Sequence, residues 1–164
     1  MENSDNISTI VSVCAILVSV VSLIVTFYFS HLQMVHNKNS VRPISFINLC
    51  DYEDCISVSI VNVGTGPLKI HKLSILGGEV ETSNLVSLLP NVPQKWSTYD
   101  DDVNGRTIPV NGTITLVEIN PKTRRTRRMI RKKLSTLTIN LEYEDIYSTK
   151  FFDKKDLTFF SRLL

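Results

Sequence analysis

The feature that most constrains this 164-residue chain is an uncharged run near its N-terminus. No Asp, Glu, Lys or Arg occurs from Ile7 to Ser30, and Ile, Leu and Val fill half of these positions. About 20 apolar helical residues cross a bilayer core of about 30 Å. A cleaved signal peptide is the alternative, but Glu2 and Asp5 stand where such a peptide is basic, and the apolar run is too long for one. The sequence therefore predicts one transmembrane helix over residues 9–30.

The charges that flank this helix predict its orientation. Residues 1–8 contain no Lys or Arg, whereas Lys38 and Arg42 follow the helix before the first acid, Asp51. Basic flanks stay preferentially in the cytoplasm. We therefore expect a single-pass protein of the inner (plasma) membrane. It would have a short extracytoplasmic N-terminus (1–8), a polar connector (31–41) and a cytoplasmic domain (42–164).

Small residues recur along one face of the predicted helix. Their spacing alternates between four and three residues, a period that keeps them on one stripe of a left-handed helix pair. Small side chains let helix backbones approach closely in lipid. This seam consists of Ser8, Ser12, Ala15, Ser19, Ser22 and Thr26. It predicts association with a second copy or with a separate membrane protein, unless the hydroxyls only bond back to their own helix.

The remainder of the chain has the pattern of an all-β domain. Apolar and polar residues alternate over 137–143 and over 56–60, which is typical of strands with one wet face. Further strands are predicted at 43–49, 68–76, 113–119, 147–152 and 157–161. Many short strands separated by turn residues predict an antiparallel β-sandwich or barrel, preceded by the transmembrane helix.

Three short motifs occur in this domain: Arg42-Pro43 at its start, N-x-G-x-G-P-x-x-I from Asn62 to Ile70, and Y-x-D from Tyr143 to Asp145. We expect Gly64 and Gly66 to adopt positive φ between two strands, and Pro67 to restart the second strand.

In this layout the chain resembles a widespread class of small bacterial membrane-anchored β-sandwich proteins. The resemblance implies the architecture and a bacterial origin, and it implies no activity. The chain departs from the class after the Y-x-D motif, where Ile146-Tyr147-Ser148 replaces a frequent Gly. More distantly, the layout is similar to antiphage effectors that join membrane helices to a nucleotide-sensing β-barrel.

A dense basic block lies near residue 125. Eight of the 18 Lys and Arg residues fall within twelve positions that contain no acid: Lys122, Arg124, Arg125, Arg127, Arg128, Arg131, Lys132 and Lys133. Basic residues in a first helical turn oppose the helix dipole, which favours a binding loop over a helix capped by Asn120. The expected ligand is an anionic lipid or, second, a nucleotide. Nucleic acid is not expected, because the block contains no aromatic residue.

The sequence predicts no metal, cofactor or catalytic set. Asp100–Gly105 matches the first half of an EF-hand loop, but Asn111 stands where the bidentate Glu is required. The histidines (His31, His36, His71) and the pair Cys50 and Cys55 lack metal-binding spacing. No nucleophile, base and orienting group can be assembled, so we expect a protein that is not an enzyme.

The sequence thus favours a membrane-anchored interaction module, which assembles through its helix and binds a protein or an anionic ligand with its cytosolic β-domain. The alternative is an antiphage-defence effector whose β-domain senses a signal, such as a nucleotide, and whose helices perturb the membrane. An anchored enzyme with a site built from distant residues is the third option.

Overall fold

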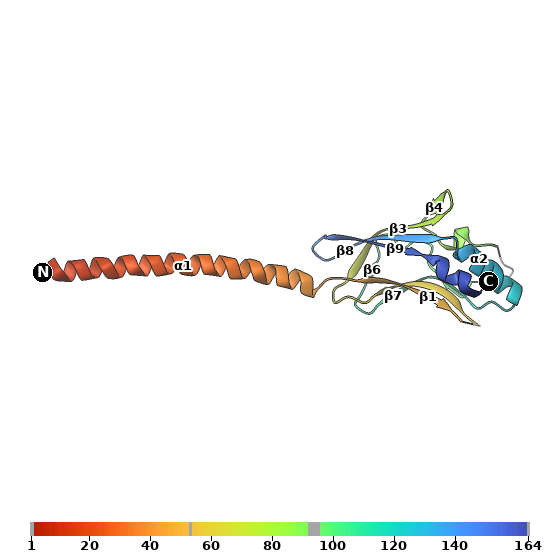
Figure 1. Cartoon of the computed structure of the whole chain (residues 1–164), viewed down its shortest axis with the longest axis horizontal. Helices are drawn as coiled ribbons and strands as arrows, with labels where there is room; N and C mark the ends of the chain where they lie inside the picture. The colour runs from red at the N-terminus through yellow and green to blue at the C-terminus, as the bar shows by residue number, and fades with distance from the viewer. Residues whose placement is uncertain (1, 53, 92–95, 164) are drawn as a thin grey trace. The chain divides into compact units, whose positions relative to one another are not determined.

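A computed structural model describes residues 2–52, 54–91 and 96–163 of the chain (Figure 1). The chain divides into two compact units, Met1–Ser40 and Val41–Leu164. The first unit is one helix, and the second, called the β-domain below, holds all the described strands.

The first unit is the 39-residue helix α1, Glu2–Ser40. It is the one described helix that is long and apolar enough to cross a membrane. Residues 31–40, which belong to the expected connector, continue the helix α1. A helix needs no apolar stripe to continue, and neither Gly nor Pro occurs before Pro43. The ring of Pro43 excludes the helical conformation at Arg42, and α1 ends two residues earlier.

The β-domain consists of two sheets in which every described pairing is antiparallel. The first sheet has the order β1-β2-β7-β5 and the second has the order β4-β3-β8-β9, with β6 also paired to β3. The strands are β1 Ser45–Asp51, β2 Ile56–Asn62, β3 Leu68–Gly77, β4 Val80–Thr82, β5 Thr98–Tyr99, β6 Thr107–Ile108, β7 Thr113–Ile119, β8 Thr138–Glu144 and β9 Lys150–Asp156. This two-sheet arrangement is compatible with the predicted sandwich.

One hydrophobic core is shared by the two sheets. Alternate residues of β2 (Ile56, Val58, Ile60) and of β8 (Ile139, Leu141) are buried in it, as their period of two predicted. On β3 the alternation changes phase, because the register shifts between Ile70 and Lys72. This bulge lets both Ile70 and Leu73 face the core, although they are three positions apart and strict alternation would place them on opposite faces.

The β-domain also contains helical segments, so all-β is a loose description of it. They are the 3₁₀ helices η1 Val86–Leu88 and η2 Leu157–Leu163, and the α-helix α2 Arg124–Leu134. Residues 157–161, predicted as a strand, lie in η2, and that prediction is wrong. Leu157 and Phe160 are both buried, and a spacing of three matches the three residues per turn of a 3₁₀ helix.

The three sequence motifs meet at the end of the β-domain where its chain begins. Gly64 and Gly66 do not have positive φ, contrary to our expectation. A Cβ at Gly66 would lie 1.8 Å from the Val41 carbonyl oxygen, and one at Gly64 would lie 2.4 Å from the Ile44 amide nitrogen. The glycines are therefore required because the backbone of residues 41–44 lies directly against this loop.

Side chains complete this junction. The side chain of Asn62 is buried. Its Nδ2 donates to the Gly66 carbonyl at 2.8 Å, and its Oδ1 accepts from the Gly64 backbone amide at 3.0 Å. The Tyr143 ring stacks on Phe151, and the guanidinium of Arg42 lies 4.8 Å from the centroid of Phe151. Thus the residues that carried the resemblance hold the first residues of the β-domain in place.

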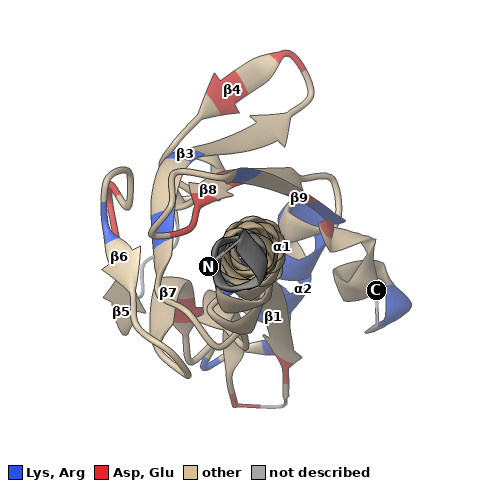
Figure 2. Cartoon of the chain, turned by 90° about the vertical axis from the view of Figure 1, so that its left-hand side faces the viewer, with Lys and Arg blue, Asp and Glu red and all other residues tan. Residues whose placement is uncertain are grey.

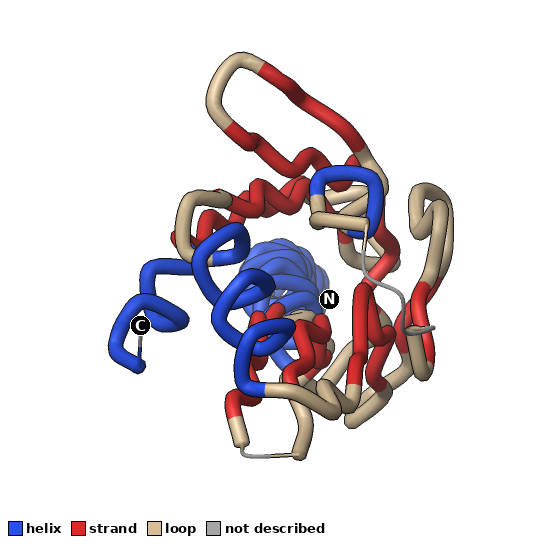
Figure 3. Tube along the Cα trace, turned by 90° about the vertical axis from the view of Figure 1, so that its right-hand side faces the viewer, coloured by secondary structure: helices blue, strands red, loops and turns tan. Residues whose placement is uncertain are grey.

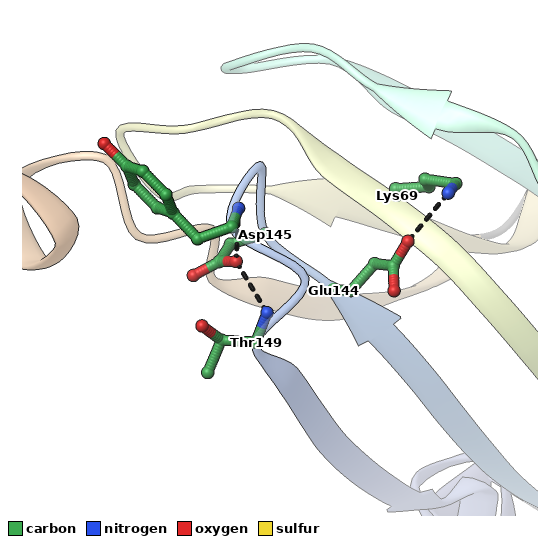
Figure 4. Close-up of polar contacts among 5 residues, drawn as sticks. Lys69, Glu144, Asp145 and Thr149 are labelled. Atoms are coloured by element: carbon green, nitrogen blue, oxygen red, sulfur yellow. Dashed lines mark hydrogen bonds and ion pairs between the residues drawn. The ribbon is translucent and has the colours of Figure 1, made fainter.

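The Y-x-D aspartate closes the turn between β8 and β9 (Figure 4). Asp145 Oδ1 accepts hydrogen bonds from the amides of Tyr147 and Thr149, both at 2.8 Å. Ser148 adopts φ of 60°, the left-handed region that favours glycine. The turn therefore keeps the backbone shape that glycine would permit, although this chain has Ser at that position.

Candidate anion-binding site on the basic helix

The basic block forms the helix α2, which corrects the predicted binding loop. The cap is Thr123, whose side chain accepts from the Thr126 amide at 3.2 Å, and it is not Asn120. Ile130 and Leu134 are fully buried on the inner face of α2. Burying such a side chain stabilises by about 1.5–3 kcal/mol, whereas an unfavourable charge at a helix end costs about 0.3–1 kcal/mol. Tertiary packing therefore outweighs the arginines of the first turn.

A buried ion pair joins α2 to the first sheet. The Nε and Nη2 atoms of Arg131 donate to Asp51 Oδ1 at 2.9 and 2.7 Å, and both residues are buried. Asp51 is the last residue of β1, so the pair links residues 80 positions apart. Arg131, which we predicted as a ligand contact, is thus a structural residue. The candidate ligand contacts are therefore the other seven cations of the basic block.

Most of the remaining cations of the block are exposed, and they lie on α2 or just before it (Figure 2). The exposed ones are Lys122, Arg124, Arg125, Arg128 and Lys132, while Arg127 and Lys133 are half-buried. Arg124, Arg125 and Arg128 form no ion pair with any side chain that the structure describes. Neighbouring charges of one sign that lack local partners create a positive potential, which attracts an anion.

This basic surface lies at the far end of the β-domain from Val41. The strand β1 runs from Ser45, near Val41, to Asp51, which holds α2 through Arg131. Seven residues of strand span about 20 Å. The helix α2 packs beside η2, and both lie at this end of the domain (Figure 1 and Figure 3).

An open groove of about 510 Å³ lies between η1 and α2. Its lining residues are Leu88, Leu89, Pro90, Met129, Lys132, Lys133 and Thr136. Apolar side chains predominate, and none of the described lining residues is acidic. Sequence reasoning missed this groove because its two walls are about 40 residues apart in the chain. Lys132 and Lys133, three and four residues after Met129 on α2, gave the only local signal.

Two hydroxyls of the predicted seam of α1 are bonded to the backbone of their own helix. Ser19 Oγ donates to the Ala15 carbonyl at 2.8 Å, and Thr26 Oγ1 donates to the Ser22 carbonyl at 2.7 Å. The side chain of Ser8 lies outside the described part of the helix. Association through the seam stays a prediction, and it would depend on close packing of small residues rather than on these two hydroxyls.

The polar side chains of the acidic loop that resembles half of an EF-hand bond to other groups of the β-domain. Asp100 forms an ion pair with Arg106 at 2.7 Å, and Asp101 accepts from the Asn84 side chain at 2.8 Å. Asn104 Oδ1 accepts from the Leu73 amide at 2.7 Å. Over the residues that the structure describes, no cluster of three or more metal-ligating side chains occurs.

Two titratable groups of the β-domain have shifted pKa values. Burial, and next the neighbouring Cys50, raise the pKa of the Cys55 thiol, which keeps it protonated and a weak nucleophile. A hydrogen bond from Lys69 lowers the pKa of Glu144 (Figure 4). The Lys69 Nζ and Glu144 Oε1 atoms are 2.7 Å apart on the outer face of the second sheet. No residue of α2 is among the causes of either pKa shift.

No protein-family model, curated protein or solved structure matches this chain. The candidate site is therefore defined by the geometry and charge of α2 and of the groove beside it.

Proposed function

We propose that this protein is a membrane-anchored interaction module. In this proposal α1 spans the inner membrane and assembles with a second copy through its seam, and the β-domain is cytoplasmic. The basic surface of α2, defined by Arg124, Arg125 and Arg128, binds an acidic segment of a partner protein.

The sequence and composition of α1 support the anchoring part of the proposal. Its apolar side chains from Ile10 to Phe29 are exposed, and exposure of that many large hydrophobic residues to water is costly. Phe27, Tyr28 and Phe29 suit the interface between lipid and water. Lys38 and Arg42 follow on the side that the positive-inside rule assigns to the cytoplasm.

One observation carries the binding part: Arg124, Arg125 and Arg128 are exposed on one helix and have no acidic partner among the described residues. Arginine forks bind carboxylates in a bidentate manner. Because guanidinium forks match carboxylates in this way, the proposed partner is a segment rich in Asp and Glu.

The experiment uses the full-length protein in nanodiscs of zwitterionic lipid, with a fluorescent deca-glutamate peptide as the probe. We expect binding that weakens steeply as salt is added, since exposed charges are screened within about 10 Å at 0.1 M salt. Arg124→Glu/Arg125→Glu/Arg128→Glu should lower the affinity at least tenfold.

The matched control reverses three exposed lysines of β9, Lys150→Glu/Lys154→Glu/Lys155→Glu. This variant carries the same change in net charge and should lose far less affinity. Equal losses in the two variants would mean that net charge alone attracts the peptide, and would contradict a site on α2.

A further inference from the structure

We propose that the groove between η1 and α2 binds a single-chain fatty carboxylate. The acyl chain would lie against Leu88, Leu89, Pro90 and Met129, and the carboxylate would contact Lys132 and Lys133. This inference goes beyond the proposed function, which uses the outward-facing arginines of α2 and does not involve the groove.

The size and lining of the groove support a small amphipathic ligand. A volume of about 510 Å³ falls within the range of about 300–1,000 Å³ that is usual for small-molecule sites. Such sites are mostly apolar with a few polar groups that orient the ligand, and this groove has that composition. Met129 is half-exposed, and its unbranched side chain adapts to the shape of an alkyl chain.

The charges of the groove select an anionic head group. Lys132 is exposed and Lys133 is half-buried, and neither forms an ion pair with a residue that the structure describes. The aliphatic stem of a lysine covers apolar surface while its ammonium reaches the rim. Lys132 and Lys133 therefore suit a ligand whose body is buried and whose single negative charge remains at the edge of the groove.

The volume of the groove, about 510 Å³, favours this single-chain ligand over the two-chain lipids of a bilayer. A carboxylate with one chain of moderate length is soluble enough to reach such a site, whereas a two-chain phospholipid has a second chain that the groove would also have to hold. We therefore commit to the fatty carboxylate, and bilayer lipid becomes an outcome of the test.

The experiment uses the full-length protein in nanodiscs and a decanoate analogue that carries a photoreactive diazirine at the end of its chain. After irradiation, labelled peptides are located by mass spectrometry. We expect labels on residues 86–90 and 129–136. Unlabelled fatty carboxylates should compete with the probe. After correction for their partition into empty nanodiscs, their affinity should rise about fourfold for each added methylene. Decanol, which lacks the charge, should compete at least tenfold less well.

Three variants make the result specific. Lys132→Glu/Lys133→Glu should reduce labelling of the groove at least tenfold, and Met129→Trp should reduce it while both lysines remain. Arg124→Glu/Arg128→Glu has the same change in net charge and should retain labelling.

Labelling confined to α1, or equal competition by decanol, would show partition into lipid only and would overturn the proposal. Equal loss in both charge-reversed variants would also overturn it. Failure here leaves deca-glutamate binding by the arginines unaffected, so the two proposals fail separately.

Discussion

Asp51, at the end of β1, and Arg131, in the last turn of α2, form a buried ion pair in which two guanidinium nitrogens share one carboxylate oxygen. The second oxygen, Asp51 Oδ2, is buried and has no hydrogen-bond partner among the described residues. The pair fixes α2 against the first sheet, and thereby positions both the basic surface and the groove.

Removing one partner of this pair should destabilise the β-domain strongly. Asp51→Asn leaves the guanidinium of Arg131 without a counter-charge in a buried position, a situation that costs about 3–5 kcal/mol. The double variant Asp51→Leu/Arg131→Met should recover most of that loss, since it removes both charges. Urea unfolding can be followed by the fluorescence of Trp96, the single tryptophan, which packs against the core. Equal destabilisation of the single and double variants would contradict this account.

The loop from Asn62 to Pro67 should not tolerate a methyl group at Gly66. Gly66→Ala places a Cβ against the Val41 carbonyl, so the backbone must move. Gly78 offers the matched control, because it has φ of 75° but open space around it, and Gly78→Ala should cost only about 1–2 kcal/mol. We expect Gly66→Ala to cost more in the same unfolding measurement. A smaller loss at Gly66 would mean that residues 41–44 do not lie against this loop.

The lowered pKa of Glu144 predicts a pH-dependent contribution to stability. Its value in the folded state is below the ordinary 4.5, because the Lys69 hydrogen bond favours the carboxylate. The contribution is therefore present above about pH 4.5 and is lost as the pH falls through the folded pKa. The difference in unfolding free energy between the wild type and Glu144→Gln should shrink as the pH is lowered from 6 to 3. A difference that stays constant would exclude this coupling.

The seam of α1 should respond to bulk on one face only. Ser19→Leu and Ala15→Leu fill the space that a facing backbone would occupy and should reduce crosslinking of the full-length protein in bilayers. Val18→Leu and Val21→Leu, on the expected lipid face, should have little effect. Ser19→Ala should also be mild, since this hydroxyl already bonds to the Ala15 carbonyl. Equal effects on both faces would leave α1 as a plain anchor.

The predicted topology can be tested with Lys155→Cys, which places a thiol on exposed surface of β9. A membrane-impermeant maleimide should leave it unmodified in intact cells and modify it after lysis. The wild type serves as the control, because Cys55 is half-buried with a raised pKa. Modification of Lys155→Cys without lysis would place the β-domain outside and remove the argument for a cytosolic partner.

Local patterns in the sequence were sufficient for the elements that have a simple period. The uncharged run from Ile7 to Ser30 predicted a helix, and the segment 113–119 predicted β7 to the residue. Period two over 137–143 predicted β8 to within one residue at each end. In these strands the apolar or polar character of each residue matches the burial of its side chain, because each face of a strand meets one kind of environment.

Features that depend on contacts between distant residues were decided only by the tertiary structure. The sequence placed eight cations together, but only the packing of Ile130 and Leu134 makes that block a helix and makes Arg131 a buried partner of Asp51. The glycines of the Asn62 loop were expected for their φ angles, yet they are required by residues 41–44. The groove has walls from two separate segments, and no local pattern contains both. The period of a sequence predicts which face of a helix or strand is buried. Which other element covers that face depends on the tertiary packing of the whole chain.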